Sequence, residues 1–291
     1  MIDLLQYLIS GLAVGSVYGF VALGFVLIYS CSQVINFAQG EFVMLGAVLA
    51  AVLLPALKIP AVLVIFFVVL VVFAVGSGIY AAVIRPLQRR RGANIELITY
   101  VMATLAVSTM LSNLVLILIG PAQRAVPPQA AGTLAVAGIA IMAQRLFVIV
   151  VSVAVATGLW LLLKKTTFGL AIRAVGISRD LSALCGIHLG YTTAFVFGLA
   201  GLLGALAGVV IAPIISASAY MGLPFAIKGF IGAVVGGIAN PMGALAGGII
   251  IGLAEILLAA YVSSAVTDIV IFVLLPVTLF LRPQGLFGET A

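Results

Sequence analysis

The sequence predicts an all-α integral membrane protein: a polytopic bundle of about eight to nine transmembrane segments, with one amphipathic helix on the cytoplasmic side. Two observations carry this prediction. Of the 291 residues, 65% are hydrophobic and only 7% are charged, whereas a soluble domain carries about a quarter charged residues. The apolar runs are long and continuous, which is typical of spanning helices, and they lack the alternating polarity of membrane β-strands.

Nine apolar segments follow one another, and most have the length of about 20 residues that a helix needs to cross a bilayer. The seventh is too short for a plain span. We expect it to be a broken or re-entrant helix, and crossing is the favoured alternative. No soluble domain or linker separates the segments, so a single transmembrane domain is expected over 1–291. The segments are 4–29, 36–56, 61–84, 96–119, 146–164, 190–213, 226–238, 242–261 and 264–281.

Basic residues orient these segments, because cytoplasmic loops carry an excess of Lys and Arg. Two clusters follow the third and the fifth segment, which places the N-terminus and the loop 120–145 outside. If 226–238 crosses, Arg282 also lies inside. The net charge of +6 therefore reflects membrane orientation and predicts no nucleic-acid partner. The clusters are Arg85, Arg89, Arg90 and Arg91, and Lys164, Lys165, Arg173 and Arg179.

Glycine recurs at four-residue spacing in the first segment and in later ones. Small residues at this spacing let helix backbones approach closely. We expect tight packing within the subunit; a glycine-lined path for a small solute is the alternative. The repeats are Gly11, Gly15 and Gly19, then Gly204 and Gly208, Gly243 and Gly247, and Gly248 and Gly252.

A polar stretch lies between the first two segments, where Asn36, Gln39 and Glu41 fall within six residues. Polar and ionisable groups at membrane depth are costly and usually face a cavity or a partner. These three residues are therefore candidates for a translocation path. The alternative is a cytoplasmic turn, in which Glu41 suits the positive end of a helix N-terminus. The residues alone leave the two alternatives open.

The loop 164–190 is long, basic and amphipathic. Phe168, Ala171, Ile172 and Val175 alternate with charged residues in a helical pattern. An amphipathic helix between two spans can dock into a groove of a cytoplasmic partner, or it can lie on anionic lipid. Docking is the favoured interpretation, with one helix expected from about Phe168 to Leu184.

A third unusual segment begins at Lys228 and is interrupted at Gly236-Gly237 and again at Asn240-Pro241. Short segments broken by Gly and Pro point to the substrate path of a transporter, because unwound backbone can coordinate a solute. The alternative is an ordinary turn at the membrane face. Glu255, in the next segment, is expected to bond to a neighbouring helix.

The residues that enzymes require are scarce. His188 is the single histidine, and no nucleophile is placed to pair with it. The two cysteines, Cys31 and Cys185, are far apart and predict neither a metal site nor a disulfide framework. A G-x-x-x-x-G-K-[ST] phosphate loop is absent, so this chain cannot hydrolyse ATP through that motif.

The three unusual segments together resemble the LivH-type permeases of branched-chain amino acid ABC importers. Ile35 to Phe42 is similar to the pattern INFAHGEF, with Gln39 in place of His. The basic loop is similar to the coupling element of the family, and the segment from Lys228 resembles its glycine-rich motif, with Lys228, Gly236 and Gly237 in matching positions. The coupling positions that this resemblance assigns are Gly169, Arg173, Ala174, Arg179, Asp180, Gly186 and Ile187.

This resemblance implies a multi-pass protein of the bacterial inner membrane that works in a complex. Two cytoplasmic ATPase subunits would bind ATP and Mg, and no cofactor is expected in this chain. A second permease of the LivM type, or a second copy of this chain, would complete the pore beside membrane lipid. An extracytoplasmic binding protein would deliver the amino acid. Arg173 and Asp180 are the expected polar anchors for the ATPases.

A channel or secondary transporter acting alone is the alternative function. The breaks at Asn36 and at Asn240 resemble, in part, the paired half-helices of aquaporins, whose N-termini point at the solute. Only the second break contains proline, and a channel acting alone has no evident need for the loop 164–190. The permease subunit is therefore the favoured interpretation.

Overall fold

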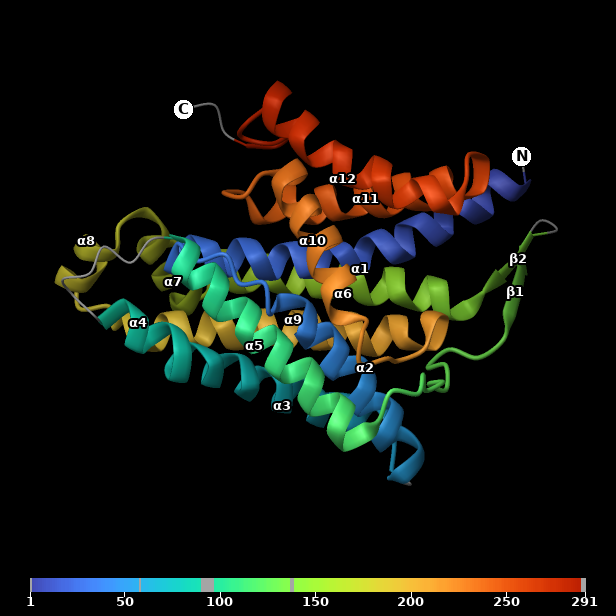
Figure 1. Cartoon of the computed structure of the whole chain (residues 1–291), viewed down its shortest axis with the longest axis horizontal. Helices are drawn as coiled ribbons and strands as arrows, with labels where there is room; N and C mark the ends of the chain where they lie inside the picture. Colours follow the sequence, from blue (N-terminus) through green and yellow to red (C-terminus); the bar gives the residue numbers. More distant parts are fainter. Residues whose placement is uncertain (1, 58, 90–96, 137–138, 289–291) are drawn as a thin grey trace.

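The computed structural model describes residues 2–57, 59–89, 97–136 and 139–288 and confirms the predicted all-α membrane fold. Among these residues, eight helices are long and apolar enough to cross a membrane. Figure 1 shows them extending between two ends of the molecule. The helices are α1 (Ile2–Ser32), α2 (Gln39–Ala56), α3 (Ala61–Ile79), the π-helix η1 (Tyr80–Ile84), α4 (Arg85–Arg89), α5 (Leu97–Ile119), α6 (Ala143–Lys165), α7 (Thr167–Ile177), α8 (Arg179–Leu184), α9 (Leu189–Ile215), α10 (Gly222–Gly236), α11 (Pro241–Tyr261) and α12 (Ser264–Leu281).

The described residues of the two basic clusters lie at one end of the molecule, which we call the basic end. Arg85 approaches Gly190 at the start of α9, and Lys164 and Lys165 lie in the last turn of α6. Arg90 and Arg91 of the first cluster lie outside the described residues. The common location agrees with the predicted orientation, in which the basic end faces the cytoplasm.

The opposite end carries the N-terminus and a short antiparallel hairpin (Figure 1). Its strands are β1 (Thr133–Val136) and β2 (Ile139–Met142), paired from Thr133 with Met142 to Val136 with Ile139. This hairpin adds local structure to the loop 120–145, which the sequence analysis placed outside without any regular element.

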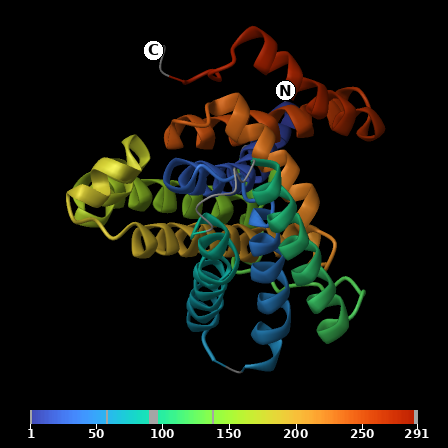
Figure 2. The same cartoon turned by 60° about the vertical axis from the view of Figure 1, so that its left-hand side comes forward.

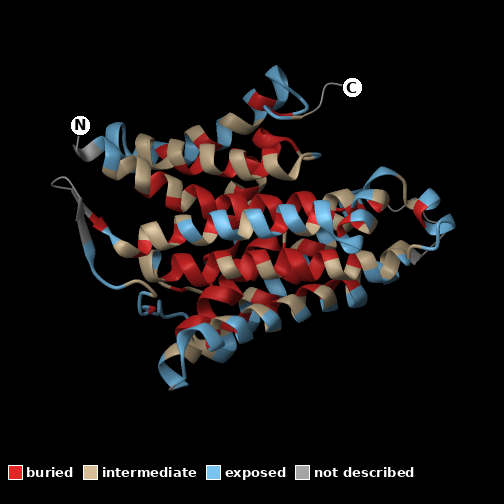
Figure 3. Ribbon diagram, turned by 180° about the vertical axis from the view of Figure 1, so that it is seen from behind, coloured by how far each residue is buried: buried red, intermediate tan, exposed pale blue. Residues whose placement is uncertain are grey.

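The core is built from two similar units, each a long helix, a reversal and a second helix that begins inside the bundle. In the first unit, α1 ends at the basic end and α2 follows it; in the second, α9 ends at the opposite end and α10 follows. The residue after each long helix has a positive φ, 56° at Gln33 and 64° at Ser216. Figure 3 shows that buried residues concentrate on these central helices.

The long helix of each unit packs antiparallel to one spanning helix and parallel to the second helix of the other unit. Gly11, Gly15 and Gly19 of α1 meet α11 in reverse order, and α9 lies antiparallel to α3 in the same way. Conversely, α2 runs parallel to α9, and α10 runs parallel to α1. The core therefore has the inverted arrangement that many transporters share.

This arrangement shows that the short seventh segment crosses the bundle. Both α9 and α11 begin at the basic end, so the chain between them must return from the opposite end. At that end Ala217 forms a two-way backbone bridge with Arg124. Residues 216–221 then lead into α10, which ends at the basic end beside Gly237. Because α11 and α12 complete two further crossings, Arg282 lies at the basic end, as the crossing alternative requires.

The glycine repeats confirm the predicted tight packing. A side chain at Gly15 would clash with the backbone of Ile249, and one at Gly248 would clash with the backbone of Gly19. At Gly204 and Gly208, the neighbour is α2 instead. Small residues at these positions allow the helix axes to approach more closely than larger side chains would permit.

Candidate functional site

The polar stretch after α1 lies inside the bundle, which contradicts the alternative of a cytoplasmic turn. Asn36 and Gln39 are fully buried, and Glu41 is 3% exposed. From Gln33 the chain turns back along α1, so that Gln39 contacts Gly24, more than two helical turns before the end of α1. Helix α2 therefore begins at depth rather than at the surface.

Hydrogen bonds to two other helices, α5 and α9, hold this stretch in place. Thr104 of α5 accepts from the backbone N–H of Phe37 (3.3 Å) and donates to the carbonyl of Ile35 (3.4 Å). Gln39 donates to the carbonyl of Ala200 on α9 at 3.0 Å. Ser108 of α5 donates to Oε1 of Glu41 at 2.8 Å.

The N-termini of α2 and α10 meet at this place. A side chain at Gly40 would clash with the carbonyl oxygen of Gly222, and one at Gly222 would meet the carboxylate of Glu41. The positive end of α10 thus lies against an acidic side chain, which is a favourable arrangement. Three buried polar atoms here lack a hydrogen-bond partner within the described residues: Asn36 Nδ2, Gln39 Oε1 and Glu41 Oε2.

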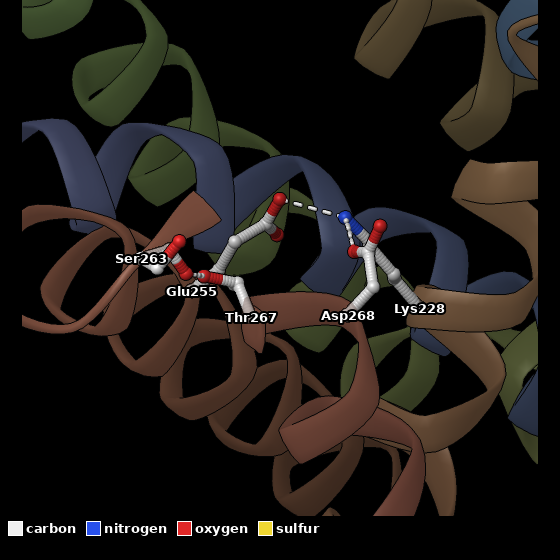
Figure 4. A network of polar contacts seen from close by, with 5 residues as sticks. All are labelled: Lys228, Glu255, Ser263, Thr267 and Asp268. Atoms are coloured by element: carbon white, nitrogen blue, oxygen red, sulfur yellow. Dashed lines mark hydrogen bonds and ion pairs between the residues drawn. The ribbon is translucent and has the colours of Figure 1, made fainter. Parts of the chain in front are cut away.

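Lys228 belongs to an ion network on the other side of α10 (Figure 4). Its ammonium group lies 2.7 Å from Oε1 of Glu255 on α11 and 3.0 Å from Oδ1 of Asp268 on α12. It also lies 5.9 Å from the ring centroid of Tyr18 on α1. Lys228 therefore ties the broken helix to three neighbours, and Glu255 bonds to an adjacent helix as expected.

Asp268 belongs to this network but is not among the predicted site residues. Its side chain is 62% exposed, whereas those of Lys228 and Glu255 are 15% and 19% exposed. Asp268 could have been selected from the sequence, because it is an ionisable residue within the predicted segment 264–281. Two carboxylates against one ammonium group leave the network with a net negative charge.

Gly236 ends α10, and Gly237 and Asn240 belong to the turn that leads into α11 at the basic end. Gly237 has φ 112°, which favours glycine. Asn240 caps α11 by accepting from the N–H groups of Met242 and Gly243, and it donates to the carbonyl of Phe287.

The predicted coupling element forms two helices, α7 and α8, so the prediction of one helix from Phe168 to Leu184 was wrong. The chain breaks at Ser178, whose side chain accepts from the N–H of Leu181 and caps α8. Figure 2 shows α7 and α8 beside the bundle at the basic end, near the turn between α10 and α11.

Several predicted coupling residues shape this element. Gly169 lies against the last carbonyl groups of α6. The carbonyl of Ala174 accepts from Ser178 at the end of α7. Gly186 has φ 81° and Ile187 donates to the carbonyl of Ser182, which together close the turn after α8.

Other residues of the element project from it. Arg179 donates to Gln88 at 3.3 Å, and Asp180 is exposed in the first turn of α8. Three apolar side chains are also exposed: Ile177 (87%), Leu184 (84%) and Leu181 (63%). We call these three the apolar ridge. Arg173 lies one helical turn before Ile177 on α7, and both residues line a cavity between α7 and the bundle.

Comparison with known proteins gives a consistent family. A family model described as branched-chain amino acid transport system / permease component matches residues 7–279. The chain is 31% identical to the high-affinity branched-chain amino acid transport system permease protein BraD of Pseudomonas aeruginosa, across 98% of this chain and 96% of the relative. It is 28% identical to the LivH permease protein of Escherichia coli K12, with the same coverage.

A solved structure resembles the fold across nearly the whole chain. PsaBC from Streptococcus pneumoniae, in complex with a Fab, aligns with a TM-score of 0.51 at 11% identity, covering 96% of this chain and 91% of that one. Among the described residues, no group of three or more His, Cys, Asp and Glu side chains is arranged to hold a metal ion.

Proposed function

Because the chain belongs to the branched-chain amino acid transport permease family, we propose that it moves branched-chain or similar small amino acids across the membrane as one subunit of an ATP-driven importer. It is a multi-pass protein of the inner membrane. Its proposed partners are two cytoplasmic ATPases that bind ATP and Mg, a second LivM-type permease or a second copy of this chain, and an extracytoplasmic binding protein.

The observation that carries this proposal is the apolar ridge on α7 and α8. Large apolar side chains exposed at the water-facing basic end are unfavourable unless a partner covers them. Arg179 and Asp180 add charged groups beside the ridge, as at the polar rim of many interfaces. An amphipathic helix pair of this kind can insert into the groove of an ATPase subunit.

Motion of α7 has a direct route to the core. The thiol of Cys31 on α1 lies 3.6 Å from the carbonyl oxygen of Ile172 on α7, and Gly176 of α7 lies against Ser30. The end of α1 precedes the reversal that positions Phe37, and Phe37 packs on Phe230 of α10 with ring centroids 5.6 Å apart. A shift of α7 would therefore reach both α2 and α10.

The proposed translocation path runs along the edge formed by α10 and α12. An exposed carboxylate at membrane depth does not face hydrocarbon, because the cost of burying an unpaired charge there is high. Asp268 therefore indicates that this edge faces a second subunit or a water-filled path. Asn36, Gln39 and Glu41 lie behind α10 and would meet a solute only when α2 and α10 separate.

The experiment is to purify the complex through a tag on this chain and measure leucine uptake in proteoliposomes. We expect two phosphate-loop ATPases to co-purify and uptake to require ATP. The variant Leu184→Glu places a charge in the ridge and should lose the ATPases, while Leu184→Met keeps its apolar character and should retain them. Uptake by the chain alone would overturn the proposal in favour of the channel.

A further inference from the structure

A cavity of about 630 Å³ opens at the basic end, between α7 and the membrane-spanning helices. Its walls come from the end of α1, the last turns of α6, the inner face of α7 and the turn before α11. Figure 2 shows these segments gathered at that end. The volume falls within the range of about 300–1,000 Å³ that is typical of small-molecule sites.

The charged side chains that line the cavity are all basic. Lys164 and Arg173 line it, and no acidic side chain does so among the described residues. Neither cation pairs with a carboxylate in that part of the chain. The ammonium group of Lys164 instead lies 5.1 Å from the ring centroid of Trp160, which also lines the cavity. Two unpaired cations in one cavity favour an anionic ligand.

The position of the cavity is that of a lipid headgroup. Lys164 lies in the last turn of the spanning helix α6, and Trp160 lies one turn deeper, in the order that is common where a helix leaves the bilayer. Deeper than Trp160, the same helix exposes Val153 and Val150. A ligand with a charged head in the cavity could therefore extend acyl chains along α6.

We propose that this cavity binds the headgroup of an anionic phospholipid, with Lys164 and Arg173 contacting the phosphate and Trp160 packing beside the glycerol region. Basic pockets between transmembrane helices on the cytoplasmic side bind such headgroups in other proteins. The lipid would sit between α7 and the bundle, so it would stabilise the docked position of the coupling element. This inference does not depend on which solute is transported.

Trp160 provides a direct test, because it is the single tryptophan of the chain. The full-length protein is reconstituted in phosphatidylcholine vesicles, and brominated phosphatidylglycerol is added at low mole fraction to quench Trp160 fluorescence. We expect saturable quenching at mole fractions where brominated phosphatidylcholine has little effect. An excess of inorganic phosphate should not relieve it, since acyl chains contribute to binding.

Two variants, one double and one single, make the test specific. Lys164→Ala combined with Arg173→Ala should weaken the phosphatidylglycerol effect roughly thirtyfold. Lys165→Ala, which changes an adjacent exposed lysine that does not line the cavity, should leave the effect unchanged. Equal quenching by the two brominated lipids in the wild-type protein would overturn the proposal, and this arm needs no variant to fold. Relief by inorganic phosphate would assign the site to free phosphate instead and would also overturn it.

Discussion

The two helix–reversal–helix units of the core have the same geometry but are held in different ways. The first unit, α1 and α2, is fixed by buried side-chain hydrogen bonds from Thr104 and Ser108. The second, α9 and α10, is fixed by the backbone bridge between Ala217 and Arg124 and by the ion network of Lys228. The first unit is therefore held by polar contacts inside the bundle, and the second is held by a backbone bridge and ion pairs at the edge of the bundle.

This difference suggests which unit moves. Buried polar groups are costly when their partners separate, so the first unit is expected to remain assembled. The ion pairs of Lys228 lie at an edge where Asp268 reaches solvent, and water can replace one partner there at lower cost. We therefore expect α10 to shift during transport while α2 serves as its support.

The largest effect is expected where the two units touch. In Gly40→Val, the new side chain would clash with the backbone carbonyl of Gly222 and with Ala226, which neither helix can avoid without moving. We expect a loss of more than about 5 kcal/mol in the free energy of unfolding and no monodisperse protein by size-exclusion chromatography. The control is Gly78→Val on α3, where no atom lies within 4 Å of the added Cβ. A normal elution profile for Gly40→Val would contradict the contact between units.

The anchor of the second unit is tested by Lys228→Met. This change leaves Glu255 half-buried without its cation, at a cost of about 3–5 kcal/mol for a broken buried pair, measured as thermal stability in detergent. The double variant with Glu255→Met removes both charges and should recover most of that loss. Asp268→Asn should lower thermal stability less than Lys228→Met or Glu255→Met alone, because Asp268 is exposed. Equal losses in all three single variants would mean that the network does not act through burial.

The anchor of the first unit is tested by Ser108→Ala. It leaves Oε1 of the buried Glu41 without its donor, which is expected to cost about 1–3 kcal/mol in the free energy of unfolding. Thr109→Ala on the same helix is the matched control, since its hydroxyl bonds only to the carbonyl of Leu105 within α5. If the control loses as much stability as Ser108→Ala, the Glu41 contact has no special role.

The smallest effects are expected at the two reversals. Ser216 has φ 64° and ψ 152°, a region that is strained for residues other than glycine. Ser216→Gly should therefore stabilise the protein by about 1 kcal/mol. Gln33→Gly should change stability less, because left-handed φ near 56° is better tolerated by polar residues. Thermal melts of the two variants would distinguish the strain at the two reversals.

The sequence predicted the spans well because the thickness of a bilayer fixes the length of an apolar helix. The segment predicted at 264–281 coincides with α12, and that at 61–84 covers α3 and η1. The depth of Asn36 and Glu41 was not predictable from hydropathy, because a polar break reads the same at the surface and inside a bundle. It depends on contacts with α5, α9 and α10, which are distant in sequence.

Two local signals could have improved the prediction of the site. Ser178 followed by Asp180 is a helix start, since serine caps a helix and an acidic residue suits its first turn. The break between α7 and α8 could therefore have been predicted from the sequence. Asp268 was a charged residue within a predicted span, which by default marks a functional position. Its partner Lys228 could not be identified without the fold.

The turn after α10 also determines the order in which the protein can be assembled. Leu286 and Phe287 donate to the carbonyl groups of Val235 and Gly236, and Asn240 donates to Phe287. Two later spanning helices must be synthesised and inserted before these contacts can form. The C-terminal end of α10 therefore lacks these hydrogen bonds until Leu286 and Phe287 have been synthesised. We expect α10 to be among the last helices of the bundle to reach its final position.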